Sequence, residues 1–229
     1  MFNGDGPDEA MLGFRHNEKF FSDAVPTNSA MRSYFDLISY STEEDRKRIM
    51  SPEFFPSTQG ALPKFLSIIE PYSDLSPAEQ AAAYELTSLL PGNNAVKGDR
   101  MGACWSIEGR APFLDHRVSE IFARLPVNEK LKGGVGKYFL KRVAESYFDH
   151  DFVYRPKTMP TVPIGEWIKG PLYQWARDVL ALPDGGRFNR SEVDRMLEDH
   201  RAGLQNFTKQ LRTLLMTKLW LNEFFPSRA

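Results

Sequence analysis

Residues 2–9 read Phe-Asn-Gly-Asp-Gly-Pro-Asp-Glu, and this stretch decides how the chain folds at its start. Two glycines flank Asp5, and Pro7 stands where a first helical turn can begin, because its fixed φ suits that position. The motif therefore predicts a glycine loop that leads into a helix. Backbone N–H groups at the start of a helix favour an anion such as a phosphate.

The same stretch carries three carboxylates, on Asp5, Asp8 and Glu9. Carboxylates repel a phosphate unless a hard cation lies between them, so one interpretation is a Mg²⁺ ion that joins Asp8 or Glu9 to a polyphosphate. The other interpretation is an ordinary acidic turn that caps a helix, since the pattern alone is a weak signal. A glycine-rich phosphate loop normally follows a buried strand, and only Met1 and Phe2 precede this one, which predicts that part of the fold lies upstream.

The composition is that of a globular protein. The chain has 229 residues, 41% of them hydrophobic, and a formal net charge of -1. This charge balance gives no excess of basic residues that would favour nucleic acid or an anionic membrane. No apolar run approaches the ~20 residues of a membrane span. The single cysteine, Cys104, excludes a metal site built on several thiolates and suits a reducing compartment. We therefore expect a cytoplasmic protein with neither nucleic acid nor membrane as a partner.

Apolar periodicity and capping residues predict helices along most of the chain, and no strong strand. Ser41 with Glu44 and Ser76 with Glu79 are candidate capping boxes, and Asp115 and Ser191 are single candidate caps. The predicted helices span residues 7–14, 30–40, 42–50, 62–70, 77–90, 94–105, 116–125, 137–148, 172–181, 192–201 and 206–225. Pro91-Gly92 should end the helix at 77–90, and the stripe Phe207, Leu211, Leu214, Leu215 and Leu219 should be core.

A glycine run, a proline-rich segment and the histidines each give a separate indication. The run Gly133-Gly134-Val135-Gly136 lacks a preceding strand and a Lys-Ser/Thr pair, so we interpret it as a plain glycine turn. Residues 153–163 are rich in proline and predict an extended loop, whose two cations favour a functional role. The four histidines lack metal-ligand spacing and receive no role, and His200 is expected on the surface of its helix.

Three segments then carry a pattern in a specific order and spacing. The first is Asn3-Gly4-Asp5-Gly6-Pro7-Asp8-Glu9. The second runs from Val96-Lys97-Gly98-Asp99-Arg100-Met101 to Glu108-Gly109-Arg110-Ala111-Pro112-Phe113-Leu114-Asp115-His116-Arg117, and the third joins Gly136-Lys137-Tyr138-Phe139-Leu140 to Arg155-Pro156-Lys157. Together they resemble the synthetase domain of asparagine synthetases, the glutamine-dependent enzymes that amidate aspartate.

The resemblance implies roles for individual residues. Asn3 and Gly4 would contact ATP, and Asp8 would bind Mg²⁺ and, through it, pyrophosphate. Asp5, Glu108 and Lys157 would be catalytic: Asp5 in forming or using the acyl-adenylate, Glu108 at the reacting centre and Lys157 on the phosphates. From the residues alone, Glu108 could equally be a structural partner of Arg110 or Arg100.

The resemblance also implies an architecture. The chain is expected to be mainly α, as the helical portion of an α/β ATP-pyrophosphatase-type synthetase domain, similar to the adenine nucleotide α hydrolases, whose parallel sheet lies mostly upstream. Residues 1–229 would form its carboxy-terminal portion, without the glutaminase domain and the pyrophosphate loop. Asn3 stands where the family usually has serine, and the stretch 158–161 departs from a glycine-containing pattern, which leaves the acyl substrate open.

The implied activity is the amidation of aspartate to asparagine through a β-aspartyl-adenylate, with ATP and Mg²⁺ as cofactors and ammonia from glutamine in the full-length enzyme. The present chain alone is then expected to be inactive, and to act as a homodimer or with a chain that carries the missing portions. Two alternatives stay open. One is a relative that closes an amide in a natural product, and the other is a helical subunit without catalysis that docks on a partner.

Overall fold

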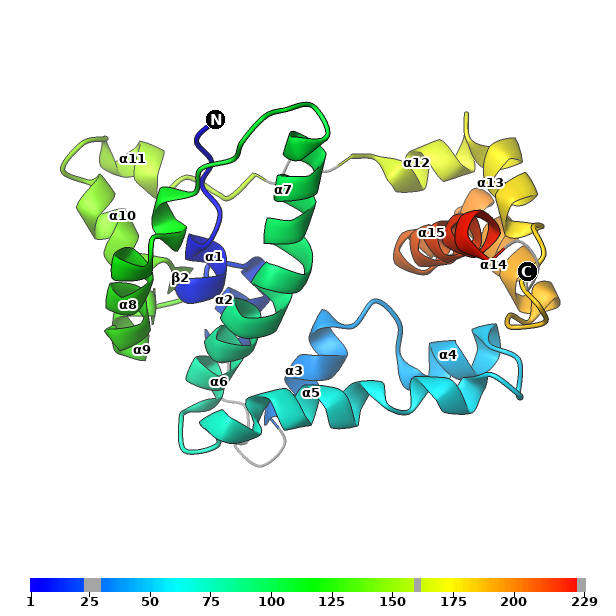
Figure 1. Cartoon of the computed structure of the whole chain (residues 1–229), viewed down its shortest axis with the longest axis horizontal. Coiled ribbons are helices and arrows are strands. Elements are labelled where there is room, and N and C mark those ends of the chain that lie inside the picture. The colour runs from blue at the N-terminus through cyan, green and yellow to red at the C-terminus, as the bar shows by residue number, and fades with distance from the viewer. Residues whose placement is uncertain (23–29, 159–161, 226–229) are drawn as a thin grey trace. The chain divides into compact units, whose positions relative to one another are not determined.

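The computed structural model describes residues 1–22, 30–158 and 162–225 (Figure 1). Within these ranges the chain is mainly helical, with two short strands, β1 (Leu131–Lys132) and β2 (Val135–Gly136). The prediction of a mainly α chain is confirmed, and the upstream sheet stays a prediction. The chain forms two compact units: unit 1 comprises residues 1–38 and 62–157, and unit 2 comprises residues 39–61 and 158–229.

Unit 1 contains the glycine loop and most of the helices. Its α-helices are α1 (Pro7–Ala10), α2 (Arg15–Ser22), α3 (Ala30–Ile38), α5 (Ala61–Ile69, which joins this unit from Leu62), α6 (Pro77–Tyr84), α7 (Val96–Ala103), α8 (His116–Arg124), α9 (Val127–Lys130), α10 (Tyr138–Ala144) and α11 (His150–Val153). A π-helical segment, η4 (Glu85–Ala95), joins α6 to α7, and the 3-10 turns η3 (Glu70–Tyr72) and η5 (Pro112–Leu114) lie between other helices.

The helix predicted from Pro7 forms but ends after one turn, and it is anchored from two sides. Ala10 and Met11 pack against Phe122 of α8, and Leu12 packs against Ala78 and Ala82 of α6. Leu12 and Met11 are completely buried, and burying such a side chain stabilises the fold by ~1.5–3 kcal/mol. The start of the chain is therefore part of the core of unit 1 and holds the glycine loop in place.

The helix that begins with the predicted Ser76–Glu79 capping box does not end at Pro91. The box forms as predicted, but α6 continues through η4, which contains Pro91, into α7 (Figure 1). In an α-helix a proline ring clashes with the carbonyl four residues earlier, whereas the i→i+5 bonding of π turns can accommodate it. Leu90, directly before the proline, is buried and helps to hold this segment against unit 1.

Two other caps differ from those predicted, and one agrees. The box of α4 (Glu43–Ile49) consists of Thr42 and Asp45, one residue later than Ser41 and Glu44. The cap of α14 (Arg190–Arg201) is Asn189, whose side chain accepts from the backbone N–H of Glu192, in place of Ser191. Asp115 caps α8 as predicted, by accepting from the N–H of Arg117.

The glycine run forms a turn, as predicted. Gly133 and Gly134 both have positive φ, +57° and +76°, and connect β1 to β2 as an antiparallel pair. This conformation favours glycine at both positions of a two-residue turn. The helix after this turn, α10, ends at Ala144 rather than Phe148. In the predicted extended loop, residues 154–158 and 162–163 have no helix or strand, and residues 159–161 lie outside the described part.

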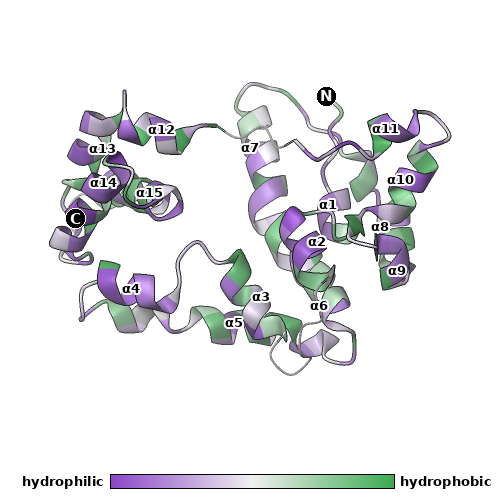
Figure 2. Ribbon diagram, turned by 180° about the vertical axis from the view of Figure 1, so that it is seen from behind, coloured by the Kyte–Doolittle hydropathy of each residue, from purple (hydrophilic) through white to green (hydrophobic). Residues whose placement is uncertain are grey.

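Unit 2 is built from α4, the 3-10 turn η2 (Phe55–Thr58), α12 (Ile164–Lys169), α13 (Tyr173–Leu180), α14 and α15 (Thr208–Phe224). Its core joins Ile49 of α4 to buried residues of α12 through α15. Helix α4 is otherwise hydrophilic (Figure 2). Helix α12 was not predicted, because proline-rich sequence precedes it.

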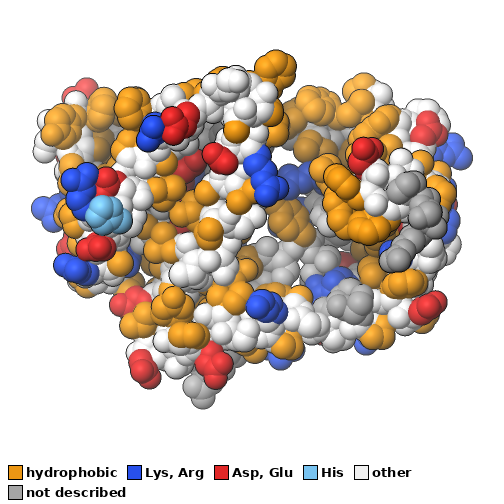
Figure 3. Space-filling model, viewed as in Figure 1, with side chains coloured by type: hydrophobic (Ala, Val, Ile, Leu, Met, Phe, Trp, Pro, Cys, Tyr) orange, Lys and Arg blue, Asp and Glu red, His pale blue; other side chains and the backbone are white. Residues whose placement is uncertain are grey.

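Two expectations about the core of unit 2 are wrong. His200 is buried, with 1% of its surface exposed, because Nε2 pairs with the carbonyl of Gly165 and Nδ1 accepts from the N–H of Phe207. Leu219 is 36% exposed, whereas Leu221 is buried in its place. Met216, Trp220 and Phe224 of α15 are also exposed, and hydrophobic side chains gather over this helix in Figure 3. No helix of the described part is both long and apolar enough to cross a membrane.

Candidate functional site

The glycine loop lies beside the segment that contains Glu108. Phe2 and Arg110 form a parallel bridge, in which the N–H of Asn3 donates to the carbonyl of Arg110 at 2.9 Å. The N–H of Arg110 in turn donates to the carbonyl of Met1 at 2.7 Å. Backbone pairing therefore joins the first and second sequence segments, although about a hundred residues separate them.

Two glycines of the loop differ in what they require. Gly6 has φ +110°, and a Cβ there would lie 2.4 Å from Cδ2 of Leu114, so both its conformation and its packing demand glycine. A Cβ at Gly4 would meet open space. Packing within the described residues therefore does not explain the glycine at position 4.

Asp5 faces helix α7. Its backbone N–H donates to Oδ1 of Asn3 at 3.2 Å, and its Oδ2 lies 3.7 Å from where a Cβ of Gly98 would stand. A local turn thus orders the side chain of Asn3 against the backbone of Asp5 at the same end of the glycine loop.

The first turn of α1 presents Asp8 to two lysines. Oδ1 of Asp8 lies 2.7 Å from Nζ of Lys157 and 3.0 Å from Nζ of Lys137. The three side chains are each about a quarter to a third exposed. We call Asp8, Lys137 and Lys157 the lysine cluster.

Lys157 is held by several contacts besides Asp8. Its Nζ donates to the carbonyl of Gly13 at 3.1 Å and lies 5.3 Å from the ring centroid of Phe14. The guanidinium of Arg15 donates to the backbone carbonyl of Lys157. Gly13 is required here, because a Cβ would come within 2.5 Å of Oδ1 of Asp8 and 2.7 Å of Cγ of Lys137.

Lysines outnumber carboxylates around the cluster. Lys141 lies one turn after Lys137 on α10, and burial lowers the pKa of its ammonium group, with Lys137 and Lys157 lowering it further. Asp8 and Glu18 act in the opposite direction on the pKa of Lys141 but do not cancel the shift. The excess of cations over carboxylates suits an anion of high charge.

Of the two acids proposed as magnesium ligands, the geometry favours Asp8. Glu9 is only 3% exposed, and its Oε1 accepts from Nδ2 of Asn94 at 2.7 Å. Burial raises the pKa of Glu9, which disfavours its charged form. Glu9 therefore serves the junction between α1 and η4 and is not offered to a ligand.

The residues present fit a Mg²⁺ ion that is shared with a phosphate. Both lysine contacts of Asp8 fall on Oδ1, so within the described residues Oδ2 keeps its lone pairs for another ligand. Those residues contain no group of three or more His, Cys, Asp or Glu that could hold a metal by itself. Mg²⁺ is commonly bound by one or two carboxylates together with substrate phosphates, which is the arrangement that Asp8 permits.

Glu108 is exposed, and its side chain pairs with Arg110. The Oε2–Nη2 distance is 2.9 Å, and 72% of the Glu108 side chain is accessible. This is the structural partnership that the sequence left open. The structure thus brings Asp8 to Lys157, and Asn3 to the Glu108–Arg110 segment, while the Glu108 side chain turns to its own neighbour.

Comparison with known proteins identifies the family. The model of the asparagine synthase family matches residues 1–222. The chain belongs to the asparagine synthase family. It is 33% identical over 146 residues to a protein of Mycobacterium tuberculosis named putative asparagine synthetase [glutamine-hydrolyzing]. The aligned region covers 63% of this chain and 22% of that protein.

Other curated members of the family give similar matches. Asparagine synthetase [glutamine-hydrolyzing] 1 of Bacillus subtilis is 28% identical over 150 residues, or 65% of this chain and 23% of that protein. The chain therefore spans about a fifth of the length of the curated relatives that it matches. No solved structure matches.

Lys137 belongs to the lysine cluster, but the sequence alone does not predict it as a site residue. Gly136-Lys137 lies in the third sequence segment, but the glycines before it predict only a turn and give the lysine no role. The structure places Lys137 in the left-handed region, φ 55°, with its N–H donating to the carbonyl of Met11 at 2.9 Å. A lysine at a glycine turn that opens a helix was the signal, but its partner Asp8 lies 129 positions away in the sequence.

Proposed function

We propose that this protein is part of an ATP-dependent amide ligase that converts aspartate to asparagine through a β-aspartyl-adenylate. One observation carries the proposal: a carboxylate in the first turn after a glycine loop holds two lysine ammonium groups, Lys137 and Lys157, at 3.0 and 2.7 Å. A polyphosphate needs clustered cations, and membership of the asparagine synthase family supplies the reaction.

In this proposal the glycine loop contacts the nucleotide, and the lysine cluster binds the phosphates of the same ATP molecule. Asn3 and Gly4 contact the nucleotide, since the open space at Gly4 lets a ligand approach the backbone. Lys157 and Lys137 hold the phosphates and balance the charge that develops as the aspartate carboxylate attacks the α-phosphorus and pyrophosphate leaves. When bound, Mg²⁺ on Asp8 would supply a further positive charge to the same phosphates.

Asp5 and Glu108 are assigned to the acyl side of the reaction. Asp5 acts in forming or using the acyl-adenylate. Glu108 is proposed at the reacting centre. Its carboxylate must then break the exposed ion pair with Arg110 to contact substrate or ammonia. An exposed ion pair of this kind is worth ~1 kcal/mol or less, so breaking it costs little free energy.

The proposal includes partners beyond this chain. Residues 1–229 are assigned to the carboxy-terminal portion of the synthetase domain, with the glutaminase domain and the pyrophosphate loop supplied by the rest of a longer chain or by another chain. Ammonia then comes from glutamine, and the 229 residues alone make no asparagine. The same proposal places the complete enzyme in the cytoplasm.

Aspartate-dependent exchange of pyrophosphate into ATP tests this function in the complete enzyme. We expect exchange with aspartate and a loss of about 10²- to 10³-fold in the Lys157→Ala variant, the range for removing one preorganised donor. Lys209→Ala, on α15 of unit 2, is the control and should keep the full rate. Exchange that depends on another carboxylic acid and not on aspartate would overturn the assignment to aspartate and favour a natural-product amide as the product. No exchange with any acid would overturn the proposed ligase function.

A further inference from the structure

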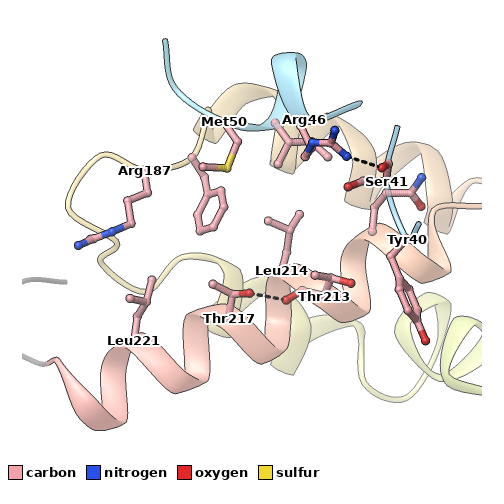
Figure 4. A pocket seen from close by; sticks show the side chains of 12 residues that line it. Tyr40, Ser41, Arg46, Met50, Arg187, Thr213, Leu214, Thr217 and Leu221 are labelled. Atoms are coloured by element: carbon pink, nitrogen blue, oxygen red, sulfur yellow. Dashed lines mark hydrogen bonds between the residues drawn. The ribbon is translucent and has the colours of Figure 1, made fainter. Parts of the chain in front are cut away.

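Unit 2 contains a pocket that the proposed reaction does not use. It has a volume of about 330 Å³ and is lined by residues of α4, of α15 and of the two segments that hold Tyr40 and Arg187 (Figure 4). This volume lies at the lower end of the range for small-molecule sites. All of its lining residues belong to unit 2.

The backbone fixes the shape of this pocket. Met50 and Phe188, which both line it, form an antiparallel bridge. On either side of this bridge, the N–H of Ser51 donates to the carbonyl of Arg187 at 2.9 Å, and the N–H of Asn189 donates to the carbonyl of Ile49 at 2.7 Å. The pocket is therefore formed before any ligand binds.

Most of the wall is apolar. Ile49, Met50, Phe188, Leu214 and Leu221 supply hydrocarbon or thioether surface. The hydroxyl of Thr213 donates to the carbonyl of Lys209. The hydroxyl of Thr217 donates to the carbonyl of Thr213 (Figure 4), so neither hydroxyl offers a donor to a ligand. A ligand must therefore bury an apolar body here.

The charged part of the wall is cationic. Two arginines, Arg46 and Arg187, line the pocket, and none of its described lining residues is acidic. Arg46 is half-buried, and Nη1 donates to the carbonyl of Ser41 at 2.7 Å. Its Nε is buried without a hydrogen-bond partner, and among the described residues Arg46 forms no ion pair with a carboxylate.

A half-buried guanidinium beside an apolar pocket without an anionic partner is costly, because its charge is partly removed from water and is not paired. A carboxylate in the pocket supplies the missing negative charge and accepts charge-assisted hydrogen bonds from a guanidinium. We propose that this pocket binds a small monocarboxylate with an apolar tail, whose carboxylate pairs with Arg46 and whose tail contacts Met50, Phe188 and Leu214.

Octanoate is the probe, with octan-1-ol as its neutral analogue and octylammonium as its cationic analogue. The whole 229-residue chain is labelled with ¹³C in its methionine methyl groups. The Met50 methyl reports on the pocket, while Met101 and Met216, which do not line it, are internal controls. We expect octanoate to shift the Met50 signal saturably with one equivalent, octan-1-ol to bind more weakly and octylammonium not to bind.

Variants separate the two parts of the site. Arg46→Gln should weaken octanoate about tenfold or more, because hydrogen bonds between charged groups are the strong ones, and should leave octan-1-ol within about twofold. Arg48→Gln is the matched control, since Arg48 lies on the same helix, pairs with Asp45 and does not line the pocket. Thr217→Phe, which fills the pocket from α15, should abolish binding of both probes.

Several outcomes would overturn the proposal. They are an unchanged Met50 signal, uptake of octanoate beyond one equivalent without saturation, or equal losses in Arg46→Gln and Arg48→Gln. A Met50 signal that shifts with protein concentration alone would also overturn it, because a second copy of the chain would then fill the pocket. The Met50 titration of the unaltered chain decides the matter even where a variant fails to fold.

Discussion

Asp8 offers one carboxylate oxygen to two ammonium groups, and this makes it a competitor of any metal-free phosphate. Replacing Asp8 with Asn removes the competing charge but keeps the size of the side chain. We expect metal-free pyrophosphate to bind about fivefold more tightly to Asp8→Asn, since a partly exposed ion pair is worth ~1 kcal/mol or less. The gain in affinity from Mg²⁺ should disappear in the same variant. Calorimetric titrations with EDTA and with Mg²⁺ measure both effects.

Asp36→Asn is the control for this experiment, because Asp36 is exposed on α3 of the same unit and makes the same change of charge. It should leave pyrophosphate affinity unchanged under both conditions. Weaker metal-free binding in Asp8→Asn would mean that Asp8 orients the lysines rather than competing for them, and would contradict this prediction.

Glu9 provides a test by pH. Burial raises its pKa above that of the unfolded chain, so the folded state binds more protons and stability falls as pH rises through this region. Glu9→Gln keeps an acceptor for Asn94 and removes the buried charge. We expect a higher melting temperature than wild type at pH 7, by about 2–4 °C for each kcal/mol gained, and no difference below pH ~4.

Thermal unfolding between pH 3.5 and 8 measures this difference. Glu120→Gln, which removes an exposed charge on α8, should follow the wild-type profile. A Glu9→Gln protein that is less stable than wild type at pH 7 would show that the charged form of Glu9 stabilises α1.

The sequence predicts Asp8 and Lys157 as members of the candidate site, and the structure brings the two side chains into contact. Their roles toward metal and phosphate stay predictions: residue type suggests that of Asp8, and that of Lys157 rests on the family resemblance. The local sequence gives Lys137 no role and leaves Glu9 as a possible ligand, because the surroundings of both depend on contacts with residues far along the chain. Burial by such contacts leaves no trace in the local sequence.

At the scale of single elements, the capping box of α6 is a clear case of local determination. The Ser76 hydroxyl accepts from the N–H of Glu79, and the Glu79 carboxylate accepts from the N–H of Ser76 at 2.9 Å. Ser76→Ala should cost ~1 kcal/mol in the free energy of unfolding, the usual value for a lost N-cap. Chemical denaturation at pH 7 measures this loss.

The cost of Ser76→Ala should shrink in acid. The hydrogen bond from Ser76 lowers the pKa of Glu79, so the contribution of this carboxylate is complete above pH ~4.5 and is lost as pH falls through its folded pKa. Ser67→Ala is the control, because the Ser67 hydroxyl bonds a carbonyl within α5 and caps nothing. A cost that is the same at pH 3 and pH 7 would contradict the coupling of the two side chains.

Other elements were decided by packing. Pro91-Gly92 is a strong local signal for a helix end, yet the helix continues as η4. Leu90 is buried on one side of the proline, and Asn94 bonds the buried Glu9 on the other, so tertiary contacts on both sides hold this segment helical. The prediction that Leu219 lies in the core fails for a related reason. An apolar stripe along one helix does not show which of its positions neighbouring elements cover.

At the scale of the whole molecule, the division into two units could not be predicted. Residues 39–61 join residues 158–229 across the intervening residues 62–157. The proline-rich segment 153–163, where the chain passes from unit 1 to unit 2, predicts a loop but not which segments share a core. Each unit has its own hydrophobic clusters: Leu211 lies in that of unit 2, and Phe65 in one of those of unit 1. Separate cores allow separate opening, because cooperativity depends on buried contacts that the opening segments share.

Leu211→Ala tests this independence. Leu211 is completely buried, so its truncation should cost about 2–5 kcal/mol within unit 2. Hydrogen exchange followed by mass spectrometry should then show faster exchange in α12–α15, with α6 and α10 unchanged. Phe65→Ala is the reciprocal variant and should speed exchange around α3, α5 and α6 while leaving α13 and α15 protected. If either variant speeds exchange equally in both units, the chain opens as one cooperative body, and the proposed carboxylate pocket and the lysine cluster would then be energetically coupled.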